Sequence, residues 1–110
     1  MDLKRGDIVT IAVQGDYGKP RPALIAQADV FNETHASISV LPLTSSIVDA
    51  PLFRLTIDPS RQNGLTHVSQ VMVDKVISVP RARIGKVIGR LGDDTMIRVT
   101  RALSVWLGIA

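Results

Sequence analysis

Short apolar runs rich in β-branched residues, separated by turn residues, fill the first 90 positions of this chain. One run alternates strictly: Phe53, Leu55 and Ile57 are apolar, whereas the residues between them are polar. This alternation is typical of a half-buried strand. The remaining runs cover residues 7–13, 23–27, 36–43, 67–73, 75–79 and 84–88, with turn residues such as Gly15-Asp16, Asp58-Pro59 and Asn63-Gly64 between them. The pattern predicts a mainly β protein built from short strands.

The tail of the chain changes to the period of a helix. Asp93 and Asp94 suit a helix N-terminus, both as caps and through the helix dipole. One helical stripe then carries Val99, Ala102, Leu103, Trp106 and Ile109. We therefore predict an amphipathic C-terminal helix of about four turns. The predicted fold class is α+β, a small barrel-like sheet with one helix packed on it. Residues 1–110 are expected to form a single domain, with residues 45–51 as its most irregular loop.

Composition narrows the possible functions. The chain has 110 residues, 45% of them hydrophobic, and no cysteine, which excludes disulfides, thiol nucleophiles and thiolate metal sites. No metal or cofactor is predicted. The N-terminus lacks the apolar core of a signal peptide, and no run is long enough to span a membrane, so a cytoplasmic protein is expected. The net charge of +3 permits an anionic partner. Aromatic residues make up only 4%, so phosphate contacts should outweigh base stacking if that partner is a nucleic acid.

Arg21 is the candidate phosphate-binding residue. It stands between Pro20 and Pro22, just before the apolar run at 23–27. Proline fixes its own φ and pushes the preceding residue towards an extended conformation, so stiff backbone holds Arg21 on both sides. A guanidinium group presents a planar fork of donors that matches phosphate oxygens. The alternative is a surface arginine paired with a neighbouring carboxylate.

Four ordered segments resemble the MazF/PemK (Kid) family of toxin–antitoxin ribonucleases. They are Lys4-Arg5-Gly6-Asp7-Ile8-Val9, then Arg21-Pro22-Ala23-Leu24-Ile25, then Leu41-Pro42-Leu43-Thr44-Ser45, and finally residues 71–79 followed by Arg81-Ala82-Arg83-Ile84-Gly85. The resemblance implies an SH3-like barrel, a homodimer, and cleavage of single-stranded RNA without a metal. It also implies a cognate antitoxin, which we expect to bind the same basic groove through an acidic, initially disordered segment.

The resemblance also assigns the site. Its arginine, threonine and acidic positions fall on Arg21, Thr44 and Asp74, which we predict to be catalytic. The predicted substrate-binding residues are Tyr17, Lys19, Ser45, Lys75, Arg81 and Arg83. In this scheme Arg21 stabilises the charge of the phosphorane, Thr44 donates to a phosphate oxygen, and Asp74 orients Arg21 or contacts a base edge. Taken alone, Thr44 would more simply end a strand and bond its own backbone.

Two departures leave the proton-transfer groups open. Some relatives carry a histidine in the loop before the Arg-Pro motif, where this chain has residues 14–19 without one, and others carry an arginine where this chain has Met72. His67 and Asp74 lie seven positions apart, which puts them on opposite faces of an unbroken strand. We therefore expect His67 and His35 to be structural or exposed.

Two alternatives remain at this stage. The gyrase poison CcdB, which has the same kind of fold, is similar in the stretch Ile77-Ser78-Val79-Pro80-Arg81-Ala82-Arg83-Ile84-Gly85 and in the ending Trp106-Leu107-Gly108-Ile109-Ala110. Trp106 also falls on the apolar stripe of the predicted helix, which favours a role in the core. The second alternative is an SH3-like binding domain without chemistry. The Arg-Pro and threonine motifs in the first half favour the ribonuclease.

Overall fold

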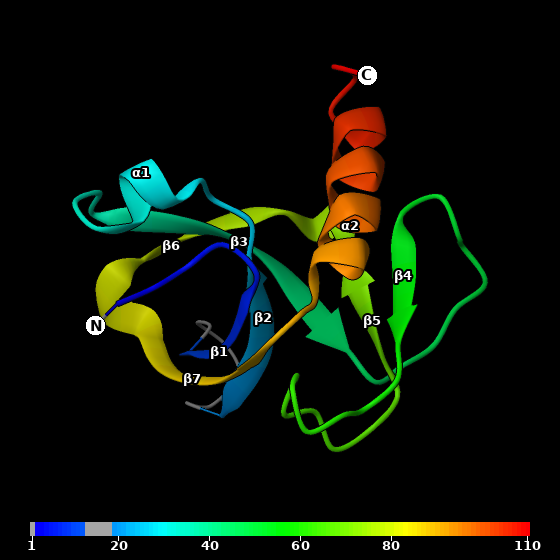
Figure 1. Cartoon of the computed structure of the whole chain (residues 1–110), viewed down its shortest axis with the longest axis horizontal. Coiled ribbons are helices and arrows are strands. Elements are labelled where there is room, and N and C mark those ends of the chain that lie inside the picture. The colour runs from blue at the N-terminus through cyan, green and yellow to red at the C-terminus, as the bar shows by residue number, and fades with distance from the viewer. Residues whose placement is uncertain (1, 13–18) are drawn as a thin grey trace.

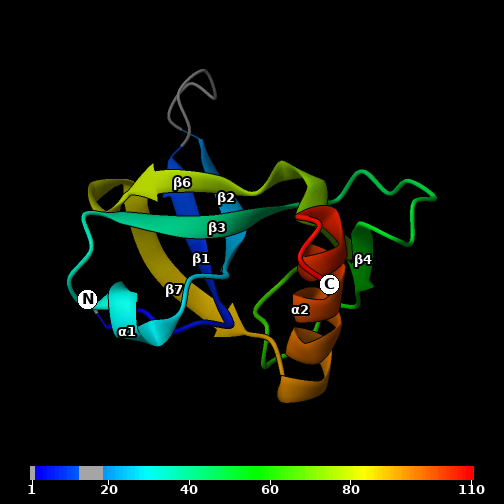
Figure 2. The same ribbon diagram turned by 90° about the horizontal axis from the view of Figure 1, so that it is seen from above.

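The computed structural model describes residues 2–12 and 19–110 of the chain. Within these residues, seven strands form one curved antiparallel sheet, and a C-terminal helix packs beside it (Figures 1 and 2). The strands are β1 (Asp7–Ala12), β2 (Pro20–Ile25), β3 (Ser37–Thr44), β4 (Arg54–Ile57), β5 (Ser69–Met72), β6 (Ile77–Pro80) and β7 (Ile84–Arg90). The helices are α1 (Asp29–Asn32) and α2 (Asp93–Trp106), with 3₁₀ turns η1 (Val73–Lys75) and η2 (Arg81–Arg83). The predicted α+β class is confirmed.

Each β-type run of the sequence becomes a strand, with shifted ends. β4 keeps the predicted alternation, because Leu55 and Ile57 are buried while Thr56 is exposed. The predicted strand at 23–27 is corrected: β2 begins at Pro20, so Arg21 lies inside the strand and not before it. The predicted strand at 67–73 is also corrected, because β5 begins only at Ser69. The short helix α1 was not predicted.

The two prolines of β2 fit the strand because its start has only one neighbour. Pro20 and Pro22 pair with Ala12 and Thr10 of β1, whereas pairing with β3 begins at Ala23. Residues two apart point their N–H groups to the same side, so both missing donors fall on the side that lacks a ladder partner. The Arg-Pro motif therefore costs the sheet no hydrogen bond.

β3 is the central strand. Its first half pairs with β6 and its last two residues pair with β5, while β2 runs along the other side (Figure 2). Pro42 lies between the last β6 partner, at Val40, and the first β5 partner, at Leu43. A proline inside a sheet is tolerated where no ladder bond is required. This break between β6 and β5 is bridged by η1, and it opens the sheet at one place.

α2 begins at Asp93, and the N-cap position before it is Gly92. No side chain donates or accepts a capping hydrogen bond there. Asp93 and Asp94 therefore lie in the first turn, where they suit the dipole, and their predicted role as caps is wrong. Met96 and Val99 bury into the core beneath the helix. The last helical residue of the predicted stripe is Trp106. Its ring packs against that of Phe53, with 5.5 Å between the ring centroids, and Trp106 remains about half exposed.

The loop of residues 58–68, between β4 and β5, is fastened to β7. The buried side chain of Asn63 accepts hydrogen bonds from the Ser60 and Leu65 amides and donates to the Asp58 carbonyl. The Gln62 carbonyl accepts from the Arg90 amide at 2.9 Å. The loop backbone also packs tightly on β7, because a Cβ at Gly89 would lie 2.3 Å from the Asn63 carbonyl carbon. The loop is thus a fixed part of the scaffold.

Candidate active site

Two adjoining cavities open where the sheet is broken. The large cavity, of about 600 Å³, is lined by Ile11, Arg21, Pro42, Leu43, Thr44, Met72, Asp74, Lys75, Val76 and Ile77. The small cavity, of about 230 Å³, is lined by Arg21, Pro22, Leu43, Thr44, Ser45, Leu65, Thr66, His67 and Ser69. Arg21, Leu43 and Thr44 belong to both, so these residues mark the boundary between the two spaces.

Strand register brings Arg21 and Thr44 to this boundary. Ala23 pairs with Pro42, and continuing the same register by two residues sets Arg21 beside Thr44. Thr44 Oγ1 accepts a hydrogen bond from the Ser46 amide at 3.1 Å. A hydroxyl that accepts still has its own proton to donate. Thr44 therefore ends its strand and bonds the nearby backbone, as expected of this residue taken alone. Its hydroxyl can also donate to a ligand.

Asp74 lies in η1 and is held by an arginine from a neighbouring strand. Arg54 of β4 donates from Nε to Oδ1 at 2.8 Å and from Nη2 to Oδ2 at 3.1 Å. The two side chains are only 14% and 15% exposed. The hydrogen bonds from Arg54 hold the pKa of Asp74 below its usual range, although partial burial opposes the shift. The same pair raises the pKa of Arg54. Asp74 is therefore a firmly ionised group in the wall of the large cavity.

Arg54 was not among the residues predicted from the sequence. It lies directly across from Met72 in the β4–β5 ladder, the position where some relatives carry an arginine. The arginine that pairs with the carboxylate thus comes from the opposite strand. No local motif marks Arg54, because the pairing depends on the register of two strands that are distant in sequence.

The other predicted substrate-binding residues do not all lie at the cavities. Lys75 lines the large cavity and Ser45 the small one. Lys19 is exposed just before β2, and Tyr17 lies outside the described residues.

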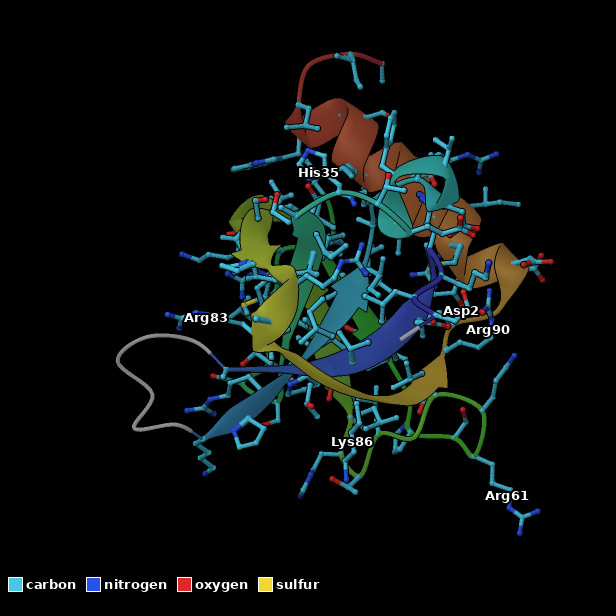
Figure 3. The ribbon with its side chains drawn as sticks, turned by 90° about the vertical axis from the view of Figure 1, so that its left-hand side faces the viewer. Asp2, His35, Arg61, Arg83, Lys86 and Arg90 are labelled. Carbon is cyan, nitrogen blue, oxygen red and sulfur yellow. The ribbon has the colours of Figure 1, made fainter. Side chains whose placement is uncertain are left out.

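Arg81 and Arg83 lie in η2, away from both cavities. The Arg81 guanidinium donates to the carbonyl oxygens of Asn32 and His35, which ties η2 to the end of α1. Arg83 approaches the carbonyl of Ala12 at the end of β1 at 3.5 Å, next to the start of β2 (Figure 3). The structure therefore gives Arg81 a structural contact and places Arg83 near the end of β1, and neither residue lines a cavity.

His67 was expected to be structural or exposed, and it is exposed, but its place beside the site was not predicted. The expectation of one strand through residues 67–73 is wrong, because His67 belongs to the 58–68 loop and Asp74 to a 3₁₀ turn. The period-2 argument that separated the two residues therefore does not apply. The structure brings His67 to the small cavity with Arg21 and Thr44.

The described part of the chain has no group of three or more His, Cys, Asp or Glu side chains placed to hold a metal ion. In the same residues, no helix is long and apolar enough to cross a membrane.

Comparison with known proteins decides the family. Residues 4–107 match the family model for the PemK-like, MazF-like toxin of type II toxin–antitoxin systems. The chain belongs to this toxin family. This confirms the resemblance found in the sequence and favours it over the gyrase poison.

Similar proteins match over nearly the full chain. The chain is 51% identical over 109 residues to a probable endoribonuclease MazF of Mycolicibacterium smegmatis, covering 98% of this chain and 99% of the relative. It is 28% identical to endoribonuclease EndoA of Bacillus subtilis, covering 99% of this chain and 97% of that relative. Among solved structures, a mycobacterial endoribonuclease in complex with its cognate antitoxin has a TM-score of 0.82 at 21% identity, covering 98% of this chain and 97% of that one. A MazE–MazF complex of Deinococcus radiodurans has a TM-score of 0.81 at 24% identity, covering 100% and 99%. The structural matches support the predicted MazF-like fold.

The Arg54–Asp74 pair generates a stability prediction. Asp74→Asn should lower the free energy of unfolding by about 1–3 kcal/mol at neutral pH, because a charged partner then remains in a mostly buried pair. The folded pKa of Asp74 is depressed, so this stabilisation is complete above the unfolded value. It should fade as the pH falls below about 3.9 towards the lower folded value.

Urea unfolding of the parent chain and of Asp74→Asn, from neutral pH down to about pH 2, measures the difference in the free energy of unfolding. Asp58→Asn, which removes an exposed carboxylate from the 58–68 loop, is the matched control and should change little. A constant difference between Asp74→Asn and the parent chain down to pH 2 would contradict the role of the ion pair.

Proposed function

We propose that this toxin is an endoribonuclease that cuts single-stranded RNA in the cytoplasm without a metal, at a phosphate held between Arg21 and Thr44. The observation that carries the proposal is that these two side chains line both cavities. A phosphate bound at their boundary would have one nucleoside in each space. The sequence similarity to proteins named as endoribonucleases supports the same activity.

The chemistry of the boundary suits phosphoryl transfer. The guanidinium of Arg21 can donate two parallel hydrogen bonds to the non-bridging oxygens. Thr44 can donate a further one. Such donors stabilise the charge that develops when the 2′-oxygen attacks phosphorus. This electrostatic stabilisation is usually the largest single contribution to the rate enhancement. Lys75 adds positive charge on the side of the large cavity.

The large cavity suits a nucleoside. Its volume of about 600 Å³ falls in the range of small-molecule sites, and apolar side chains such as Ile11, Met72 and Ile77 can contact the face of a base. Asp74, fixed by Arg54, offers acceptor oxygens to a base edge. We therefore assign Asp74 and Lys75 to substrate recognition in this cavity, with Ser45 and Lys19 along the RNA backbone on either side.

Catalysis is tested with a long single-stranded RNA in EDTA. Arg21→Ala should reduce the cleavage rate by roughly 10²–10³-fold, because it removes the main donor to the transition state. Thr44→Ala should cause a smaller loss, and Thr44→Ser should retain most activity, since it keeps the hydroxyl. Arg61→Ala is the matched control, because Arg61 points into solvent from the 58–68 loop (Figure 3) and lines neither cavity. Cleavage that survives Arg21→Ala, or that EDTA abolishes, would overturn the proposal.

We also propose that the toxin is a homodimer that uses the outer face of α2. A shallow groove of about 300 Å³ runs between α2 and the segment before β4, lined by Pro51, Leu52, Leu55, Arg98, Arg101, Ala102 and Val105. Other exposed apolar side chains stand close by in the chain, at Ile47 and Val48 before Pro51 and at Trp106 and Leu107 after Val105. Exposed apolar surface of this kind is a frequent mark of a protein–protein interface.

Sedimentation velocity tests the dimer. Leu52→Asp should shift the toxin from dimer to monomer, because it buries an unpaired carboxylate in an apolar contact. Val30→Asp on α1 is the control, since Val30 and Leu52 are both 75% exposed and α1 lies away from this groove (Figure 1). A parent chain that sediments as a monomer, or a Leu52→Asp variant that remains a dimer, would be evidence against this interface.

The expected antitoxin would occupy the RNA groove. Arg21, Lys75 and Lys19 give the groove its positive charge, so an acidic segment that folds on binding would compete directly with RNA. Solved complexes of related toxins with their antitoxins are consistent with such a partner.

Salt dependence measures the electrostatic part of this interaction. Raising the salt concentration from about 0.1 M to about 1 M shortens the Debye length roughly threefold, so the affinity for the cognate antitoxin should fall at least about tenfold. Calorimetric titration at both concentrations gives the change. An affinity that does not depend on salt would show that charge attraction is not what holds the antitoxin.

A further inference from the structure

The 58–68 loop brings three residues to the small cavity, Leu65, Thr66 and His67, and His67 carries the imidazole. His67 lines the small cavity together with Arg21 and Thr44, although it is remote from both in sequence. The loop that carries it is fixed by Asn63 and by its tight packing against Gly89 of β7. The Ser69 hydroxyl also donates to the His67 carbonyl at 3.0 Å, which ties the residue to the start of β5. The imidazole is therefore mounted on rigid backbone.

The small cavity needs a proton-transfer group, and His67 is suited to be that group. Among the described residues that line it, Thr44, Ser45, Thr66 and Ser69 carry hydroxyls, which are poor acids at neutral pH. The Arg21 guanidinium does not give up its proton. Imidazole is the side chain best suited to general acid–base catalysis near neutral pH.

Thr66 can orient the ring in each of its protonation states. Its Oγ1 lies 2.9 Å from His67 Nδ1. A hydroxyl can accept from a protonated Nδ1 or donate to an unprotonated one, so this contact persists whether the ring is charged or neutral. Nε2 is then the nitrogen left to exchange a proton with a ligand in the cavity. A second partner that fixes a catalytic imidazole is a recurring feature of such sites.

The two cavities indicate which end of the reaction His67 serves. The attacking 2′-hydroxyl must be held close to phosphorus and in line with the leaving group. The large cavity can fix a whole nucleoside, so the attacking nucleotide belongs there. The leaving 5′-oxygen then points to the opposite side, towards the small cavity and His67.

From this geometry we propose that His67 is the general acid of the RNA cleavage reaction, an inference that rests on the proposed function. The 2′-oxygen loses its proton to water and bonds to phosphorus, and the bond between phosphorus and the 5′-oxygen breaks. That electron pair stays on the 5′-oxygen, which takes the proton from His67 Nε2. The products are a 2′,3′-cyclic phosphate and a 5′-hydroxyl, and His67 regains its proton from solvent.

The test compares two oligonucleotides built around a cleavage site mapped on a longer RNA. One is ordinary RNA, and the other carries sulfur in place of the leaving 5′-oxygen. His67→Gln should slow cleavage of ordinary RNA by roughly 10²–10⁴-fold, the usual contribution of a general acid. It should slow cleavage of the sulfur-bridged RNA by less than about tenfold, because thiols are much more acidic than alcohols and a thiolate leaves unprotonated.

Two controls separate this inference from the proposed function. His35→Gln removes the other histidine, which lies at the opposite end of the molecule from Arg61 and its loop, and should leave both rates unchanged (Figure 3). Arg21→Ala should slow both substrates, because charge stabilisation is needed with either leaving atom. If the parent chain cuts neither RNA, the proposed function itself fails.

Two outcomes with an active parent chain would overturn the role of His67. One is a His67→Gln variant that cuts ordinary RNA at the parent rate. The other is a variant slowed equally on both substrates, which would mean that His67 does not protonate the leaving group. Thermal unfolding of each variant shows whether a slow rate reflects misfolding, and Thr66→Val, which removes the partner of Nδ1, should weaken cleavage of ordinary RNA more than cleavage of the sulfur-bridged RNA.

Discussion

The whole site depends on one strand that pairs with different neighbours along its length. β3 bonds to β2 on one side, and on the other it bonds first to β6 and then to β5. Pro42 stands where the second side changes partner and could not have donated a ladder bond there. The sheet opens at that point, and the large cavity lies in the opening with Pro42 in its wall. Thr44 ends the same strand, so the residue that closes the ladder also faces the phosphate boundary.

Around this opening the structure assembles charge in two ways. Arg21 comes from a strand whose prolines need no hydrogen bond on their open side, so a stiff backbone can carry a cation at the rim without weakening the sheet. Asp74 comes from the 3₁₀ turn that bridges the gap, and Arg54 keeps it ionised from β4, the strand that pairs with β5 just before that turn. A carboxylate with a depressed pKa is a weak base and carries no proton to donate at neutral pH, which separates the task of recognising substrate from the task of moving protons. That second task falls to a different loop, on the other side of Arg21.

Much of the fold could be predicted from sequence, because local patterns carry it. The alternation at residues 53–57 and the helical stripe after Asp94 each reflect one face turned to the core. The alternation appears in β4, and the stripe appears from Val99 to Leu103, whereas Trp106 is about half exposed and Ile109 lies beyond the end of α2. The errors lie where tertiary contacts override a local signal. The run at 67–73 has strand composition throughout, yet His67 and Val68 belong to a loop because Asn63 and β7 hold the chain there. The sequence also predicted Arg21 to lie before its strand, because prolines are typical strand breakers. Only the structure shows that Pro20 and Pro22 have no strand partner on one side, where their missing N–H groups cost nothing.

The sequence by itself determined the strands, the C-terminal helix and the family, and through the family it pointed to Arg21, Thr44 and Asp74. These follow from residues close together in the chain, where spacing and backbone chemistry act directly. Only the tertiary structure decided that Arg54 pairs with Asp74 and that His67 shares a cavity with Arg21. Both depend on strand register and on the path of an anchored loop. No local pattern encodes them, because the residues that meet are brought together by the sheet and not by their neighbours in sequence.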